Sequence, residues 1–214
     1  MTTRNHLLLL VTMALAAMLS LSAGAQVGKS LGVVDANTAA EADLAAMPHL
    51  TPAIAKALVA QRPFASIVDL NTFLLAQGLS QEQATAFYGK AFVHIDLNTA
   101  TPDEILLVPG AGRRMAREFA EYRPWKTWPQ FDKEIAKYVG ADETARLAQY
   151  CFIPVDLNTA TDEDILSIPG TGRRMVREFK EYRPWKAKEQ FFKEIGKYVD
   201  EKEVARLWRY VVIR

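Results

Sequence analysis

A sixty-residue repeat governs what this chain can fold into. Residues 95–153 align with residues 155–213 without a gap, and 37 of the 59 aligned positions are identical. The stretch at 109–115 reads PGAGRRM, and it returns at 169–175 as PGTGRRM. Because two copies this similar must share one fold, the repeat predicts an array of small units rather than one large domain.

A more diverged copy precedes these two. It opens with VDANTA at 34–39, and its residues 47–48 and 62–64 match residues 108–109 and 123–125 of the second copy. His49, Leu50 and Thr51 stand where the second copy has Gly110, Ala111 and Gly112. We therefore expect the first copy to keep the fold but to have lost the glycine hairpin and its chemistry.

Capping and periodicity predict four short helices in the second copy. Thr101, Pro102 and Glu104 form a helix start, and Pro109-Gly110 ends that helix. A second helix is expected from Arg113 to about Tyr122, a third from about 129 to 138, and a fourth from about 142 to 150. Their inward residues follow helical spacing and are Met115, Phe119, Tyr122, Phe131, Ile135, Tyr138, Leu147 and Tyr150. The predicted fold class is all-α, with two helix-turn-helix units in each copy.

The N-terminus has the three parts of a secretory signal. Residues 1–6 carry Arg4, residues 7–21 are almost wholly apolar, and Ala23-Gly24-Ala25 supplies small residues for cleavage. The apolar run is shorter than a membrane span, which disfavours an anchor. The predicted organisation is a signal peptide at 1–25 and three modules at 26–93, 94–153 and 154–214. We expect a periplasmic or secreted protein with no membrane span after cleavage.

The net charge limits the kinds of molecule the protein could bind, and the cysteine content limits its covalent cross-links. The 26 basic and 25 acidic residues nearly cancel, and the three modules carry −1, −1 and +2. This balance argues against strong, diffuse binding of polyanions, so binding of nucleic acid must depend on local charge. Cys151 is the single cysteine, which excludes an internal disulfide, and Val211 at the equivalent position indicates a small buried residue there.

The glycine turn before the second helix is the candidate binding site. Gly110 and Gly112, like Gly170 and Gly172, allow a tight turn beside a helix N-terminus, whose free N–H groups and dipole attract anions. The basic residues Arg113, Arg114, Arg173 and Arg174 follow, although cations are disfavoured at that end of a helix. A docked phosphate would explain them. The alternative is a solvated basic turn.

Only some of these arginines have an acidic residue four positions later with which they could form an ion pair. Arg114 can pair with Glu118, and Arg117 with Glu121, whereas the position four after Arg113 is Arg117. The third copy repeats the pattern, with pairs expected at 174–178 and 177–181 and with Arg173 unpaired. Arg113 and Arg173 are therefore the arginines most available to an anion.

Together these motifs resemble the ComEA-type helix-hairpin-helix domain of bacterial competence proteins. The shared features are DLNTA, then PGxG, then a helix ending in Tyr-Arg, and they recur over nearly the whole chain after residue 25. The resemblance implies binding of double-stranded DNA through backbone phosphates, without sequence specificity, in DNA uptake. It assigns the contacts to Gly110, Gly112, Gly170, Gly172 and the arginines that follow them.

The chain departs from that family at the second hairpin of each module. Residues 139–142 read VGAD and residues 199–202 read VDEK, and their acidic side chains would repel phosphate. Similar folds with degenerate hairpins make protein contacts in PsbU-type subunits of photosystem II. A structural or adaptor protein of the cell envelope, with envelope proteins as partners, therefore remains the alternative.

No catalytic or metal-binding pattern is visible in the sequence. The histidines His6, His49 and His94 are scattered, and no His/Cys metal spacing occurs. The carboxylates are accounted for by helix caps and by pairs four residues apart. We expect a non-enzymatic protein without cofactor or metal.

Overall fold

The structure is a computed structural model that describes residues 32–214, so the expected signal peptide at 1–25 lies outside the described residues. The described chain is mostly helical, as predicted, and the order strand, four helices, strand occurs three times. We name residues 32–93, 94–153 and 154–214 the first, second and third segments. None of the helices in the described residues is long and apolar enough to cross a membrane.

Each segment has the same sequence of elements. The first contains β1 (Val34–Asp35), α1 (Glu41–Ala45), α2 (Pro52–Gln61), α3 (Ile67–Ala76), α4 (Gln81–Tyr88) and β2 (Ala91–Phe92). The second contains β3 (Ile95–Asp96), α5 (Pro102–Leu106), α6 (Arg113–Glu121), α7 (Trp128–Val139), α8 (Ala141–Ala148) and β4 (Cys151–Phe152). The third contains β5 (Val155–Asp156), α9 (Asp162–Leu166), α10 (Arg173–Glu181), α11 (Lys188–Ile195), α12 (Glu201–Trp208) and β6 (Val211–Val212).

The short strands were not predicted, and they correct the all-α fold class. The first and last strands of each segment pair in parallel, with Val34 opposite Ala91, Ile95 opposite Cys151 and Val155 opposite Val211. Strands of two residues are too short to show the alternation of apolar and polar residues that reveals a strand in a sequence. Each pair joins the two ends of one segment.

The helix boundaries follow the predicted caps. Thr101 accepts from the backbone N–H of Glu104, and the Glu104 carboxylate accepts from the N–H of Thr101 at 2.8 Å, which completes the capping box. α6 begins at Arg113, as expected. The predicted inward residues Met115, Phe119, Phe131, Ile135, Leu147 and Tyr150 are buried, whereas Tyr122 and Tyr138 are half-buried.

The loop aromatics also belong to the core. Trp125 and Trp185 are fully buried, and each indole N–H donates to the carbonyl of a phenylalanine six residues earlier. Cys151 is buried, as the repeat predicted, and burial raises the pKa of its thiol well above the usual range. Apolar burial of this kind is the main stabilising term of so small a unit.

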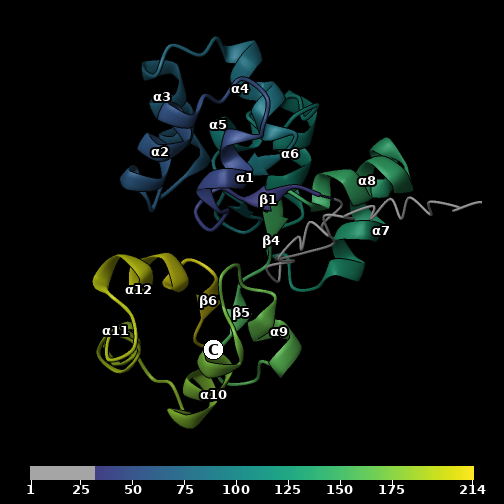
Figure 1. Cartoon of the computed structure of the whole chain (residues 1–214). Helices are drawn as coiled ribbons and strands as arrows, with labels where there is room; N and C mark the ends of the chain where they lie inside the picture. Colours follow the sequence, from purple (N-terminus) through teal and green to yellow (C-terminus); the bar gives the residue numbers. More distant parts are fainter. Residues whose placement is uncertain (1–31) are drawn as a thin grey trace, which may run out of the picture.

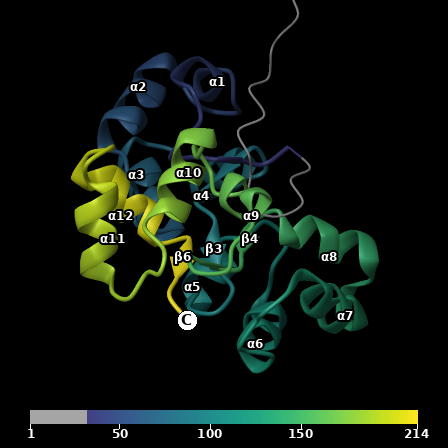
Figure 2. The same cartoon turned by 90° about the horizontal axis from the view of Figure 1, so that it is seen from below.

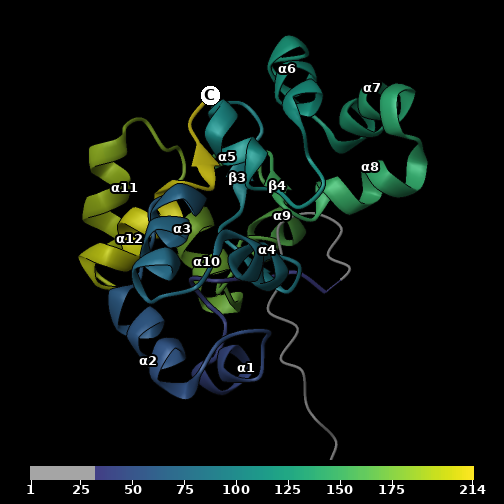
Figure 3. The ribbon, with the colours of Figure 1, turned by 90° about the horizontal axis from the view of Figure 1, so that it is seen from above.

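The segments do not form a straight row. In Figure 1 the helices α9 to α12 lie below α1 to α3, with β4 between the two groups and with β5 and β6 among the lower helices. Figures 2 and 3, seen from below and above, show α7 and α8 set apart on one side and α11 and α12 on the other. The third segment also contacts the first directly, because the hydroxyl of Tyr210 donates to the carboxylate of Asp35 at 2.6 Å.

Candidate nucleic-acid interface

Two glycine turns place the start of α6 and of α10 at the surface. Gly110 has φ 79° and Gly170 has φ 77°, a conformation that other residues adopt only at a cost. The N–H of Ala111 donates back to the carbonyl of Val108 at 2.9 Å, which closes the turn. The structure thus has a glycine turn before the second helix of each of these two copies, where the sequence placed it.

The first turns of α6 and α10 leave their N–H groups available. Gly112 and Gly172 occupy the N-cap positions, and neither helix has a side-chain cap. By contrast, Thr101 and Thr161 cap the helices just before the hairpins. Uncapped N–H groups at the positive end of a nine-residue helix can bind an anion of phosphate size.

The first segment keeps the turn in its backbone, contrary to our expectation that the hairpin was lost. His49 has φ 62°, close to the values at Gly110 and Gly170, although it is not a glycine. The chemistry nevertheless differs. Thr51 caps α2 by accepting from the N–H of Ile54, and Pro52 removes one N–H from the first turn. The helix start that could take an anion in the later segments is therefore satisfied internally here.

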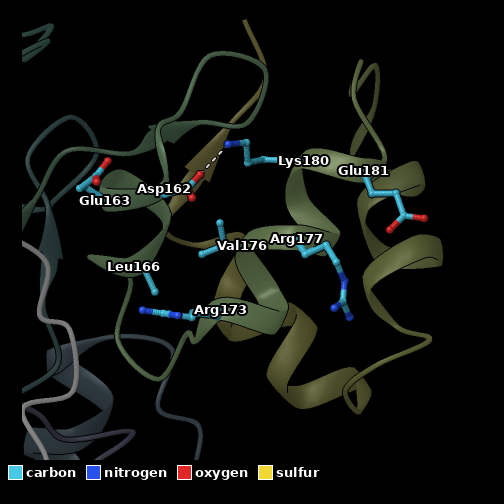
Figure 4. A pocket seen from close by; sticks show the side chains of 8 residues that line it. All are labelled: Asp162, Glu163, Leu166, Arg173, Val176, Arg177, Lys180 and Glu181. Carbon is cyan, nitrogen blue, oxygen red and sulfur yellow. Dashed lines mark hydrogen bonds and ion pairs between the residues drawn. The ribbon is translucent and has the colours of Figure 1, made fainter.

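Arg113 and Arg173 lie exposed at these helix starts. Neither side chain forms an ion pair or hydrogen bond with any residue in the described part of the chain. Both arginines are thus available to an external anion, as their spacing predicted. Figure 4 shows Arg173 directed toward Leu166, across the opening between α9 and α10.

Arg114 and Arg174 have a different environment, which the sequence did not predict. The guanidinium of Arg114 lies 4.8 Å from the ring centre of Tyr138, and that of Arg174 lies 5.2 Å from the ring centre of Tyr198. Nε of Arg114 is also 4.0 Å from a carboxylate oxygen of Glu118, the expected partner. These cation–π contacts hold the two arginines against their own segments.

A buried carboxylate and two tyrosines complete this arrangement. The side chains of Glu118 and Glu178 are buried, with 9% and 2% of each residue exposed. Beside them, the hydroxyls of two tyrosines form a hydrogen bond in each segment, at 2.8 Å between Tyr122 and Tyr138 and at 2.9 Å between Tyr182 and Tyr198. The pKa of Glu178 is lowered, most by a hydrogen bond from Tyr198 and next by one from Arg177. The exact recurrence of these residue types in both copies was the one signal that could have revealed the cluster.

Of the four predicted ion pairs, only Arg114–Glu118 forms in the described part of the chain, and those at 117–121, 174–178 and 177–181 are absent. Nη2 of Arg177 pairs with Glu178, the next residue in the chain, at 2.8 Å, and not with Glu181 four residues on. The buried Glu178 carboxylate attracts the nearer cation, because a charge that has lost its water requires a partner close by. Glu181 contributes only a longer-range attraction to Arg177.

Two depressions adjoin the third segment's hairpin. A groove of about 830 Å³ between α9 and α10 is lined by both signs of charge, including Asp162, Arg173 and Lys180. Lys180 bridges the groove to Asp162 at 2.5 Å (Figure 4). A smaller hollow of about 150 Å³ is lined by the hairpin residues Gly170 to Gly172 together with Arg174, Tyr198 and Glu203.

The second hairpin position carries acidic groups, as the sequence indicated. Gly140 adopts φ 81° before α8, but Asp142 and Glu143 occupy the first turn of that helix. In the third segment the carboxylate of Asp200 accepts from the N–H of Glu203 at 2.8 Å and so caps α12 itself. Negative charge at these positions disfavours an anion there, so the turns at 110–112 and 170–172 are the better candidate anion sites.

Comparison with known proteins finds a similar motif in the first segment. A family model described as "Helix-hairpin-helix motif" matches residues 29–84, which include the turn at His49 and the start of α2. No curated protein and no solved structure gave a significant match. Residues 29–84 are thus similar to the helix-hairpin-helix motif.

Proposed function

We propose that the three segments are tandem helix-hairpin-helix modules of ComEA type, and that the protein binds double-stranded DNA without sequence specificity. The observation that carries the proposal is the pair of uncapped helix starts at Gly112 and Gly172, each followed by an exposed arginine without an internal partner. Helix-hairpin-helix motifs commonly bind nucleic acids, which is compatible with this assignment.

The chemistry of the contact follows from those groups. A phosphate oxygen would accept from the N–H groups of the first helical turn, while Arg113 or Arg173 would supply a positive charge beside it. The glycines allow the backbone to approach the phosphate closely. Since these contacts reach only the DNA backbone, they carry no sequence information.

The cellular setting is part of the same proposal. The N-terminal pattern described above supports an exported, periplasmic or secreted protein, and the resemblance supports a part in DNA uptake. A non-enzymatic role agrees with a site made of helix ends and arginines, which bind and orient phosphate but offer no nucleophile.

The test compares two charge-matched double variants of the protein, each titrated with DNA at several salt concentrations. Arg113→Ala/Arg173→Ala should weaken binding and lower the slope of log K against log salt by roughly one unit per lost phosphate contact. The control Arg117→Ala/Arg177→Ala removes the same charge one turn further along. It should change the slope less, because both arginines lie one turn away from the free N–H groups and Arg177 is already paired with Glu178.

Equal effects of the two variants would contradict the hairpin as the site. Two unrelated duplexes of one length should bind equally if the contact is to the backbone alone. If the parent protein binds neither duplex, the adaptor function leads. The mixed charges of the α9–α10 groove favour that alternative, since they suit a protein surface better than a polyanion.

A further inference from the structure

The first segment contacts the third at a buried polar cluster around Asp35. Asp35 is 2% exposed, and its Oδ2 accepts from the Tyr210 hydroxyl at 2.6 Å and lies 3.2 Å from Nδ1 of His94. Arg209 adds a hydrogen bond to the carbonyl of His94 at 3.1 Å. A buried carboxylate is stable only with such partners, so the Tyr210 bond holds the third segment to the first, while Arg209 holds it to His94 at the start of the second.

This carboxylate is used differently from its counterparts. In the later segments the equivalent Oδ2 atoms of Asp96 and Asp156 accept from the hydroxyls of Thr99 and Thr159, both at 3.0 Å. In the first segment Thr38 instead donates to the backbone carbonyl of Asp35. The Oδ2 atom of Asp35 is thereby left for a partner 175 residues away.

The same contact reaches the hairpin of the third segment. A methyl group built on Gly170 would lie 3.1 Å from Cγ2 of Thr38 and 3.1 Å from Nη2 of Arg206. At the equivalent Gly110 the nearest atoms belong to Arg146 and Glu143, both of the same segment. A residue of the first segment therefore lies beside Gly170, whereas the atoms nearest Gly110 belong to its own segment.

Arg206 connects the contact to the hollow beside the hairpin. Its side chain is 2% exposed, compared with 31% for its counterpart Arg146. Arg206 pairs with Glu203 at 2.6 Å, and Glu203 lines the hollow formed by Gly170 to Gly172. Arg206 therefore lies between the hollow beside the hairpin and the charge of Asp35.

We propose that the first segment serves as a backing for the hairpin at 170–172, docked through Asp35 and Thr38, so that this hairpin holds a DNA phosphate only while the contact is made. The proposal rests on the proposed function for its DNA-binding part. Asp35, Thr38 and Tyr210 are positioning residues here, since none of them would touch the DNA.

The test uses the full chain and two matched hydroxyl deletions, Tyr210→Phe at the contact and Tyr150→Phe at the equivalent position of the second segment. Amide hydrogen exchange reports the docking without DNA. Tyr210→Phe should accelerate exchange at 34–38 and 170–176 roughly tenfold or more, while exchange at 110–116 stays unchanged. Asp35→Asn should act in the same way. Unchanged exchange at 34–38 and 170–176 in both Tyr210→Phe and Asp35→Asn would overturn the docking.

Salt dependence of DNA binding then tests the consequence. In the parent, Arg113→Ala and Arg173→Ala should each lower the salt slope by roughly one unit. In the Tyr210→Phe background, Arg113→Ala should still do so, whereas Arg173→Ala should have no further effect. A full effect of Arg173→Ala there would contradict the backing role. If neither arginine matters in the parent, the proposed function fails, and the exchange result still decides the docking.

Discussion

Asn98 joins the start of the second segment to the loop before α7. Its side-chain oxygen accepts from the N–H of Trp125 at 2.6 Å, and its amide group donates to the carbonyl of Trp125 at 3.0 Å. Asn37 and Asn158 make the same pair of bonds to Phe64 and Trp185. One asparagine per segment thus satisfies both backbone groups of a buried aromatic residue, which explains its place in the repeated motif.

Asn98→Ala should therefore destabilise the protein strongly for a single half-buried residue. The substitution leaves the N–H and carbonyl of Trp125 without partners, which should cost about 2 kcal/mol. Urea unfolding measures the loss. Gln81→Ala, an exposed change at the start of α4, serves as the control and should stay within about 0.5 kcal/mol of the parent. A similar value for Asn98→Ala would show that water replaces the lost bonds.

Among the elements, the turn before α6 contains two glycines, Gly110 and Gly112, and glycine is suited to each position for a different physical reason. Gly110 has φ 79°, and a methyl group there would lie 2.8 Å from Nη2 of Arg146. Gly112 is extended, with φ −110°, and a methyl group there would meet nothing within 4 Å. The fold thus favours glycine at the first position, although His49 adopts a similar φ in the first segment, while the second glycine is needed only if something outside the chain approaches closely.

Single alanine substitutions should separate these two reasons. Gly110→Ala should lower the free energy of unfolding by about 1–2 kcal/mol, because it forces a left-handed conformation on alanine. Gly112→Ala should change stability less and yet weaken DNA binding, because its methyl group stands where a phosphate would approach. Thermal melting and DNA titration of both variants check this. Normal binding by a stable Gly112→Ala protein would place the phosphate elsewhere.

The sequence predicted these elements unevenly, for physical reasons. The helices α5 and α6 were predictable because their caps and glycines are local, and α6 begins at the expected Arg113. The strands were not, because two residues show no periodicity. The turn at His49 was missed because a positive φ is inferred from glycine, and this turn has none.

The candidate site was likewise only partly predictable. The exposed Arg113 and Arg173 follow from spacing along one helix. The contacts of Arg114 and Arg174 with Tyr138 and Tyr198 do not, since those tyrosines lie on another helix. The bond between Asp35 and Tyr210 spans 175 residues, a separation over which a single sequence gives no indication of contact.

At the scale of the whole molecule, the Asp35 cluster makes the stability of the contact between the first and third segments depend on pH. Burial raises the pKa of Asp35, but its bonds to His94 and Tyr210 and the charge of Arg206 outweigh this and lower it from 3.8 to about 2. A carboxyl group with a lowered pKa stabilises the folded state above its unfolded pKa. That contribution is lost as the pH falls through the folded value.

Acid should therefore weaken the fold through this residue between about pH 4 and pH 2. The contribution is on the order of 2 kcal/mol. Urea unfolding at pH 5 and pH 2.5 should show a larger loss for the parent than for Asp35→Asn, which lacks the titrating group. Asp43→Asn, at an exposed position, should behave like the parent. Equal acid sensitivity of parent and Asp35→Asn would show that the cluster does not contribute.

The parallel pairing of β1 with β2, β3 with β4 and β5 with β6 has a consequence for how such a chain can grow. In each segment the last strand lies beside the first and runs in the same direction. The next unit can then begin within two residues, as Val93 and His94 show between β2 and β3. A duplicated stretch of coding sequence would arrive with its own entry and exit already matched. The number of segments can therefore change without altering any one of them, and two copies identical at 37 of 59 positions are what a duplication would leave.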